Sequence, residues 1–500
     1  MFMYKVSIHT MADTRLSTGL DELDDILDGG FVRHQNALLR GPPGAGKTIF
    51  GLHFLADGID NGETSLYVNL GEPSTYVRDT TAHFDLHPDD LHFHDLSPSE
   101  AAFDDAENYT MFSSAEVEQP SFIEDLRATV EDLQPDRVLL DPITEFRFLT
   151  TDDRQFRKQI LGLLDFLKAN DATVLLTSQA AATQPDDDLQ FLTDAVINLD
   201  TDVEGRSLHV SKSRGSSFQR GHHSYEISDA GVTVWPKLVP NTQDTDFTQE
   251  TLSSGVPELD QLLNGGIETG TVTFFSGPTG AGKTTTGLHF LKEAVSRGLN
   301  SVLYSFEEST DTIFARSDAI NIPVRDMAER DKLSIVEILP DRYTTDQFTN
   351  MVRTAVEDDG ADVVMIDGMQ GFKTNLRGLE DDPSKTILRL GRYLRSHGVS
   401  TIITNEVHNV TGEFRATEEH TSNLADNIVF LRHVEYDGEM RKVIGVLKMR
   451  TSDFERTLRE LEITEHGLKV GDPLPGMRGI LTGTPELAGE AHGDPGTDDH

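Results

Sequence analysis

Short runs of apolar residues alternate with longer segments of helical periodicity along most of this chain. In the second half, the apolar runs have the length and composition of buried strands: 271–277 (TVTFFSG), 301–306 (SVLYSF), 363–367 (VVMID) and 400–405 (STIITN). Residues 284–298 and 383–398, which lie between these runs, place apolar side chains three and four positions apart and are predicted helices. Buried strands that alternate with helices predict an α/β fold, with a mostly parallel sheet covered by helices on both faces.

The chain contains a large internal repeat. The matching segments are 17–31 with 253–267, 41–48 with 277–284, and 211–214 with 447–450, each offset by 236 positions. Between them the offset falls to 226, because the first copy carries an extra segment near 97–120. A repeat of this length indicates a duplicated domain rather than a short solenoid unit.

The repeat sets the expected domain boundaries. We expect a first domain at 1–235, a linker at 236–250, a second domain at 251–484 and an acidic tail at 485–500. The tail is rich in Gly and acid and low in apolar residues, which predicts disorder. Each domain opens with a predicted short amphipathic helix, at 19–27 and 255–263.

Both copies contain the pattern G-x-x-x-x-G-K-[ST] between an apolar run and a helical segment. The residues are Gly41, Pro42, Pro43, Gly44, Ala45, Gly46, Lys47 and Thr48, and Gly277, Pro278, Thr279, Gly280, Ala281, Gly282, Lys283 and Thr284. Such a loop turns backbone N–H groups and a helix N-terminus toward phosphates. The pattern predicts ATP bound twice, with Lys47 and Lys283 at the outer phosphates and Thr48 and Thr284 as ligands of Mg²⁺.

A second metal ligand is expected at the end of a neighbouring strand. Residues 138–142 (VLLDP) and 364–368 (VMIDG) each end an apolar run in Asp, which identifies Asp141 and Asp367 as candidates for the Mg²⁺ site.

The two copies differ in acidic residues after the strand that follows the phosphate-loop helix. The second copy has Glu307 and Glu308 at this point, whereas the first has Gly71 and Glu72. A carboxylate beside the γ-phosphate can accept the proton of an attacking water or hydroxyl. We therefore expect Glu307, Glu308 and Glu72 to act in catalysis.

The tandem halves, the openings of the type GLDELDDILDGG, both phosphate loops, FEES at 306–309 and KMR at 448–450 together resemble the KaiC family of RecA-like ATPases. The resemblance covers roughly residues 14–485 and includes archaeal relatives. It implies two tandem RecA-like P-loop domains, slow ATP hydrolysis and a homo-hexamer with ATP at subunit interfaces. It also implies a regulatory or signalling role, with autophosphorylation of Ser and Thr in the second domain.

The resemblance assigns further residues. The family's Lys-x-Arg pair, which reaches the ATP of the neighbouring subunit, matches Lys212 and Arg214 and also Lys448 and Arg450. The family commonly has Gly after this motif; Gly215 keeps it, whereas Thr451 departs from it.

The acceptor segment of the family matches residues 418–427 (EEHTSNLADN), where Ser422 is the expected phospho-acceptor and Thr421 an alternative. The second position of the family's acceptor pair is Asn423, so an ordered two-site cycle does not follow. An ordinary polar loop is the alternative interpretation.

The first copy has Gln190 and Phe191 at the acceptor positions. We therefore expect the second domain to activate hydroxyl and water, and the first to bind ATP chiefly for ring assembly and to hydrolyse it slowly. Replacing Gly71 by Glu is then expected to raise hydrolysis in the first domain.

The amino-acid composition indicates the cellular environment and limits the possible partners of the protein. The chain has 85 Asp and Glu against 43 Lys and Arg, a net charge of −42, spread along its length. Such a surface repels nucleic acid and suits a cytoplasm of high salt, which predicts a halophilic source. The chain has no Cys, and neither a signal peptide nor a membrane span is expected, so we predict a cytoplasmic protein with no membrane partner.

Two other functions share the same core. A recombinase or helicase would need basic or aromatic loops to bind DNA, whereas the loops after Asp141 and Asp367 are mixed in charge. A scaffold that only binds ATP would not need Lys283, Thr284, Glu307 and Asp367 together. Regulatory protein partners cannot be named from the sequence.

Overall fold

The computed structural model describes residues 15–71, 90–96, 119–150, 152–179, 186–203, 205–240, 250–378, 383–407, 424–436 and 438–474, single positions between 75 and 81, and the pairs 477–478 and 486–487. The chain divides into two compact units, Met1–Lys237 and Leu238–His500.

The first unit alternates strands and helices. Its elements are β1 (Arg15–Leu16), α1 (Asp21–Ile26), β2 (Phe31–Val32), β3 (Asn36–Gly41), α2 (Lys47–Asp60), β4 (Ser65–Asn69), β5 (His92–Asp95), α5 (Gln119–Leu133), β6 (Arg137–Asp141), the 3₁₀ helix η4 (Ile143–Leu149), α6 (Asp153–Ala169), β7 (Thr173–Gln179), α7 (Asp187–Leu192), β8 (Ala195–Thr201), β9 (Arg206–Ser213), β10 (His223–Ser228) and β11 (Gly231–Trp235).

The second unit repeats this order. Its elements are β12 (Thr251–Leu252), α8 (Pro257–Leu262), β13 (Ile267–Glu268), β14 (Val272–Gly277), α9 (Lys283–Ser296), β15 (Ser301–Ser305), α10 (Thr310–Ala319), α11 (Val324–Glu329), β16 (Leu333–Glu337), α12 (Thr345–Glu357), β17 (Val363–Asp367), α13 (Met369–Asn375), α14 (Pro383–Ser396), β18 (Ser400–Glu406), β19 (Asn427–Tyr436), β20 (Glu439–Lys448), β21 (Arg459–Thr464), β22 (Gly467–Pro473), β23 (Met477–Arg478) and β24 (Glu486–Leu487).

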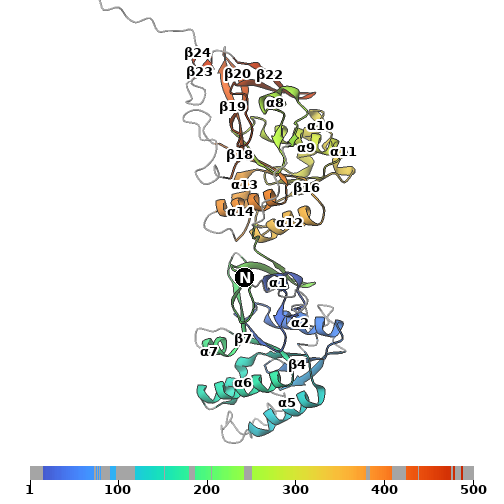
Figure 1. The fold of residues 1–500 in the computed structure, drawn as a ribbon, viewed down its shortest axis with the longest axis vertical. Helices are drawn as coiled ribbons and strands as arrows, with labels where there is room; N and C mark the ends of the chain where they lie inside the picture. The colour runs from blue at the N-terminus through green and yellow to red at the C-terminus, as the bar shows by residue number, and fades with distance from the viewer. Residues whose placement is uncertain are drawn as a thin grey trace, which may run out of the picture. The chain divides into compact units, whose positions relative to one another are not determined.

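Each unit is built on one large sheet, which is nine-stranded over the described residues (Figure 1). The first sheet has the order β11-β10-β9-β8-β3-β7-β6-β4-β5, and the second has the matching order β22-β21-β20-β19-β14-β18-β17-β15-β16. Six strands of each sheet are parallel. The other three, β9 to β11 in the first sheet and β20 to β22 in the second, form an antiparallel extension. The predicted fold of two tandem RecA-like α/β domains is confirmed.

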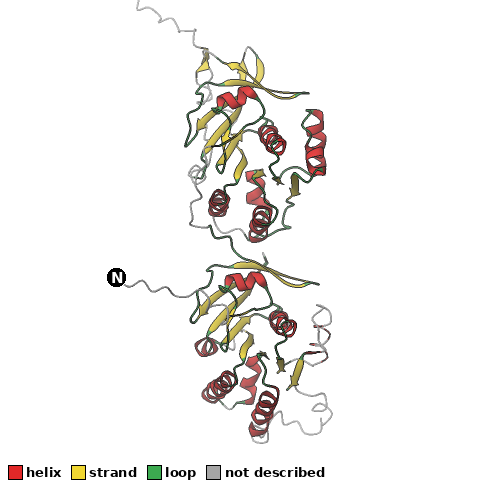
Figure 2. Cartoon of the chain, turned by 45° about the vertical axis from the view of Figure 1, so that its right-hand side comes forward, coloured by secondary structure: helices red, strands yellow, loops and turns green. Residues whose placement is uncertain are grey.

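Helices lie on both sides of the strands, as Figure 2 shows. Because side chains alternate along a strand, each central strand contributes to two cores. In β14, Phe274 packs with side chains of α12, α13 and α14, whereas Phe275 packs with those of α8, α9 and α11. The first unit shows the same division, with Leu38 in one core and Leu39 in the other. These layers hold the carboxyl ends of the parallel strands in place.

The structure describes one short strand within the predicted tail. Within residues 485–500, Glu486–Leu487 pairs with Met477–Arg478 as a short antiparallel strand, β24 against β23. Backbone hydrogen bonding to an upstream strand does not depend on apolar side chains, so composition alone did not predict it. Among the residues that the structure describes, no helix is long and apolar enough to cross a membrane.

A buried arginine stabilises the first unit. Arg137 opens β6 and is 1% exposed. Its guanidinium donates to Glu63 (2.6 Å), to Asp57 (2.7 Å) and to backbone carbonyls of Ser17 and Phe54. The second unit has Val363 at the equivalent position, so this network belongs to the first unit alone.

We expect Arg137→Met to lower the free energy of unfolding of the first domain by about 3 kcal/mol, because two carboxylates lose a buried partner. Trp235 is the only tryptophan and lies in this domain, so its fluorescence during denaturant titration at high KCl reports this domain. Arg33→Met is the matched control: Arg33 also donates to Glu63 but is 36% exposed at the side chain, and its loss is expected to cost under about 1 kcal/mol. Equal losses in the two variants would contradict the prediction.

Candidate nucleotide-binding and catalytic site

Each phosphate loop joins a buried strand to a long helix, as predicted. In the second domain β14 ends at Gly277 and α9 begins at Lys283, and Gly282 precedes the helix with a left-handed φ of 107°. In the first domain β3 ends at Gly41, and Gly46 has a φ of 84°. Residues other than glycine rarely adopt this left-handed backbone conformation, which turns the helix N-terminus toward the loop. The result is an anion site at the start of a 14-residue helix.

The loop lysines lie across their own loops. Lys283 Nζ donates to the carbonyls of Gly277 (2.9 Å) and Pro278 (3.0 Å). Lys47 Nζ makes the same two bonds to Gly41 and Pro42, both at 2.9 Å. Burial lowers the pKa of Lys283, while the negative charges of nearby carboxylates act in the opposite direction. Both cations are therefore placed in the phosphate loops, where the sequence predicted them.

The candidate metal ligands meet in pairs. Asp367 ends β17 and is 2% exposed; its Oδ1 accepts from Thr284 (2.9 Å) and from Thr404 of β18 (2.7 Å). Burial raises the pKa of Asp367, and the two hydroxyl donors partly offset this.

The first domain repeats the pairing. Asp141 accepts from Thr48 (2.7 Å), and Thr177 of β7 donates to its other oxygen. A carboxylate beside a hydroxyl at a phosphate loop is an all-oxygen donor set that fits Mg²⁺.

Glu307 lies over a glycine. It follows β15, and a Cβ added to Gly368 would lie 2.7 Å from Glu307 Cγ, so no larger residue fits there. Burial raises the pKa of Glu307, and the charge of Asp367 raises it further, whereas Lys283 lowers it. The carboxyl of Glu307 is therefore close enough to Asp367 and Lys283 for both charges to act on it.

Glu308 has a different environment. Arg316 of α10 donates to its Oε1 at 2.5 Å, and its other oxygen is buried without a hydrogen-bond partner among the described residues. The two neighbouring acids therefore have different partners. The charge of the phosphate-loop residue Lys283 acts on Glu307, whereas Glu308 forms an ion pair with Arg316. Arg316 had no signal in the sequence, because it contacts Glu308 only through the fold of α10.

The first domain fills the corresponding space differently. A Cβ added to Gly71 would lie 2.9 Å from Cδ of Pro142 and 3.5 Å from Cγ of Glu145. The second domain has Gly368 and Gly371 where the first has Pro142 and Glu145. A glutamate at position 71 would have to displace the ring of Pro142, which stands where the second domain has Gly368. Its effect on hydrolysis in the first domain stays a prediction.

Three predicted residues cannot be placed: Glu72, Thr421 and Ser422 lie outside the described residues. Their roles stay predictions.

The Lys-x-Arg pairs lie far from the phosphate loop of their own domain. Lys448 Nζ donates to Ala425 O (2.6 Å), and Arg450 donates to Asp426 Oδ1 (3.1 Å). Asp426 in turn accepts from the backbone N–H of Val272, the first residue of β14, whereas the phosphate loop begins at its last residue, Gly277. At about 3.3 Å per residue these points lie about 17 Å apart along the strand.

The first domain places its pair in the same way. Lys212 Nζ donates to Gln190 O (2.7 Å) and to Thr193 O, and Arg214 donates to Asp194 (3.2 Å). Burial lowers the pKa of Lys212 and of Lys448. The structure thus separates these residues from the phosphate loop within each domain.

Four further polar residues on the strands escaped the sequence interpretation. Glu406 ends β18 and accepts from Thr279 of the phosphate loop, whereas the first domain has Gln179 at this position. Thr404 and Thr177 bind the metal-site carboxylates. In the first domain, Tyr67 also donates to Asp141 at 2.8 Å, where the second domain has Leu303. The sequence feature that could have predicted these residues is a polar residue within an apolar run.

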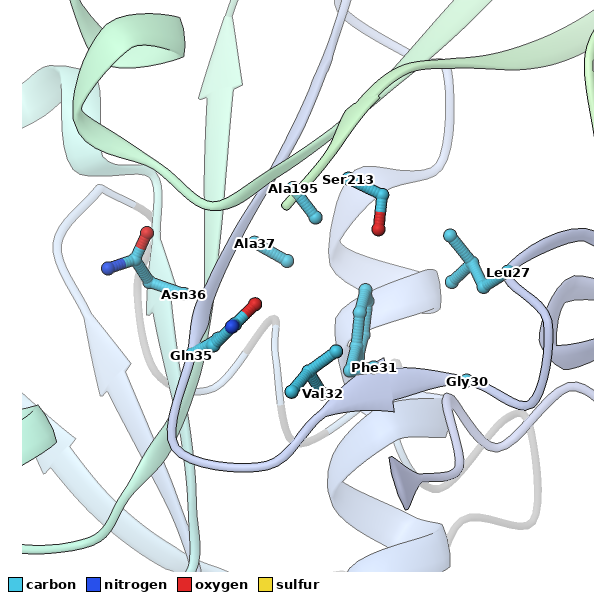
Figure 3. Close-up of a pocket in the computed structure, with 9 residues that line it drawn as sticks. All are labelled: Leu27, Gly30, Phe31, Val32, Gln35, Asn36, Ala37, Ala195 and Ser213. Carbon is cyan, nitrogen blue, oxygen red and sulfur yellow. The ribbon is translucent and has the colours of Figure 1, made fainter. Parts of the chain in front are cut away.

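Figure 3 shows a small pocket elsewhere in the first domain. Its lining residues are Leu27, Gly30, Phe31, Val32, Gln35, Asn36, Ala37, Ala195 and Ser213. With a volume of about 10 Å³ it has room for about one water molecule and none for a nucleotide.

Comparison with known proteins agrees with this geometry. The KaiC ATPase family model matches twice, over residues 16–239 and 252–474. Among similar curated proteins are the circadian clock protein KaiC3 of Synechocystis sp., 26% identical over 492 residues, and the circadian clock oscillator protein KaiC of Prochlorococcus marinus, 25% identical over 493 residues. The matches cover 94% of this chain in both cases, and 94% and 95% of the respective relatives. Since both domains match the family along almost their whole length, the chain belongs to the KaiC family of ATPases.

Proposed function

We propose that this protein is a Mg²⁺-dependent ATPase whose second domain also transfers phosphate to a hydroxyl of the protein itself, in a regulatory or signalling role. The observation that carries the proposal is the placement of Glu307 beside Gly368, Asp367 and Lys283. The relatives are named as circadian clock proteins, which favours regulation over DNA processing.

The residues of the second domain divide the chemistry among them. The α9 N-terminus and Lys283 bind and orient the phosphates. Thr284 and Asp367 would hold Mg²⁺, which neutralises charge on the phosphate oxygens. Glu307 accepts the proton of the attacking water or hydroxyl, the new P–O bond forms at the γ-phosphorus, and the bond to the bridging oxygen breaks to release ADP.

The raised pKa of Glu307 also matters for this role. A carboxylate whose proton affinity is increased by burial is a stronger base than an exposed glutamate, provided that the pH keeps it ionised. The first domain lacks this acid at position 71. We therefore infer slower hydrolysis there, with bound ATP serving assembly.

Assembly follows from the position of the Lys-x-Arg pairs. Lys448 and Arg450 lie at the opposite end of β14 from their own phosphate loop, which supports a contact with the nucleotide of another copy of the chain. We infer a homo-oligomeric ring, with six copies as the resemblance implies, in which each nucleotide lies between neighbours. A cation from the neighbour would stabilise the charge of the transferred phosphoryl group, as an arginine finger does.

The first prediction tests the transfer itself. After incubation with γ-labelled ATP and Mg²⁺ at high KCl, we expect label on the wild-type protein and none on Ser422→Ala. Glu307→Gln should also lose the label and lower second-domain phosphate release by about 100-fold or more, because it lacks the proton acceptor. Label that moves to Thr421, found by mass spectrometry, would identify the alternative acceptor. Released phosphate without any labelled protein would contradict the kinase and leave an ATPase.

The second prediction concerns pH. The part of the phosphate-release rate that depends on Glu307 is the wild-type rate minus the rate of Glu307→Gln. It should reach its maximum at pH values where the carboxyl is ionised. It should fall about tenfold per pH unit below a pKa that lies above the ordinary value of 4.5. This direction follows because burial favours the protonated form, which cannot accept a proton. An acid limb at or below the ordinary value would contradict the assignment.

The third prediction tests the shared site by mixing two inactive chains before ATP is added. Lys283→Ala keeps its Lys-x-Arg pair, and Arg450→Ala keeps its phosphate loop, so mixed rings should regain autophosphorylation that neither variant shows alone. The matched control mixes Lys283→Ala with Glu307→Gln, whose defects affect the same side of the site, and should recover nothing. If the mixture of Lys283→Ala and Arg450→Ala shows no more autophosphorylation than the two variants measured separately, the site lies within one chain.

A further inference from the structure

Two histidines and an aspartate meet on one face of the antiparallel extension of the first domain. Asp200 lies in β8, His209 in β9, and His222 directly precedes β10. The register pairs Asp200 with Ser207 and Leu208 with His223, so the three residues lie on adjacent strands and on the same face. Their side chains are 51%, 31% and 64% exposed, in that order, so an ion could reach them from solvent.

The spacing of their ligand atoms suits a metal ion. Nδ1 of His209 lies 3.0 Å from Oδ2 of Asp200, and Nδ1 of His222 lies 3.7 Å from the same oxygen. One ligand atom from each residue lies within 4.8 Å of the other two. Four ligands on a tetrahedral ion with bonds of about 2.0–2.1 Å are about 3.3 Å apart, so the two observed distances lie on either side of that value.

This group is the one set of three or more His, Cys, Asp or Glu side chains, among the residues that the structure describes, with such spacing. The metal-site carboxylates at the phosphate loops are separate from it in the fold. They use hydroxyl partners, whereas this cluster offers two imidazoles.

The second domain shows that the sheet does not require the cluster. By strand register, Arg432, Gly445 and Leu458 take the positions of Asp200, His209 and His222. A Cβ added to Gly445 would lie 2.7 Å from Cδ2 of Leu458 and 2.8 Å from Cε1 of Phe430, so this region is packed with apolar side chains. The same strands therefore fold with a buried arginine, a glycine and a leucine at these positions in one copy and with three potential ligands in the other.

We propose that Asp200, His209 and His222 form a binding site for a divalent transition-metal ion, for which Zn²⁺ is the best match. Two imidazoles and one carboxylate favour Zn²⁺, Ni²⁺ or Cu²⁺ over Mg²⁺ and Ca²⁺, which prefer oxygen ligands alone. The net charge of −42 raises the local concentration of cations near the surface. Three protein ligands leave a further coordination position for water or a ligand from outside.

The ion would tie together β8, β9 and the start of β10. Strand β10 also carries Tyr225, whose hydroxyl donates to the carbonyl of Ala45 in the phosphate loop at 2.8 Å. The metal site is therefore joined to the first nucleotide site by a single short strand. We expect bound metal to stabilise this part of the first domain.

The test measures Zn²⁺ binding to the full chain by equilibrium dialysis, without nucleotide. High KCl and excess Mg²⁺ suppress binding to the many surface carboxylates. We expect one tight equivalent per chain, and Co²⁺ in its place should give the visible absorption of a tetrahedral site. His209→Ala and His222→Ala should each weaken binding by at least about tenfold. Zn²⁺ should also raise the midpoint of thermal unfolding that Trp235 fluorescence reports.

His466→Ala is the matched control. His466 is an exposed histidine that lies 3.6 Å from the carboxylate of Glu465 but lacks a second histidine, so its loss should leave binding unchanged. All three substitutions affect exposed or half-buried side chains, and circular dichroism with phosphate release would verify folding. Absence of the tight equivalent, or equal affinity in His209→Ala and wild type, would overturn the proposal and leave a hydrogen-bonded surface cluster.

Discussion

A buried carboxylate at the end of a central parallel strand organises each half of this protein. Asp367 ends β17 and accepts hydrogen bonds from Thr284 of the phosphate loop and Thr404 of β18, and Asp141 does the same in the first domain with Thr48 and Thr177. A buried charge must be hydrogen-bonded or bind a cation to be tolerated. This requirement holds the phosphate loop, the candidate metal ligand and two strands in one geometry.

The two halves keep this arrangement and differ beside it. The second domain has Glu307 where the first has Gly71, and Gly368 where the first has Pro142. These differences are linked, because in each domain a glycine at the end of one strand leaves space for a side chain at the end of the neighbouring strand. Glu307 lies next to Gly368, and Pro142 lies next to Gly71. A glutamate at position 71 would therefore also require a change at Pro142, and the two copies of one fold differ in the side chains beside their phosphate loops.

The opposite end of each sheet carries the Lys-x-Arg pair. In a chain with few basic residues, these cations are tied to acids and carbonyls at the amino end of the central strand, by Asp194 in one domain and Asp426 in the other. Because the phosphate loop lies at the carboxyl end of the same strand, this separation is the geometric basis of the proposed assembly.

Much of this was readable in the sequence. The alternation of apolar runs and helical segments and the repeat determined the fold class, and the spacing of the loop, acid and Lys-x-Arg motifs determined most candidate site residues. These features depend on local geometry and on order along the chain. The tertiary structure alone decided which of two adjacent acids is influenced by Lys283 and which pairs with Arg316, and that Pro142 crowds position 71. It also revealed Arg316, the polar strand residues Glu406, Thr404, Thr177 and Tyr67, and the cluster of Asp200, His209 and His222. These depend on contacts between strands and helices that are distant in sequence, where no spacing rule applies.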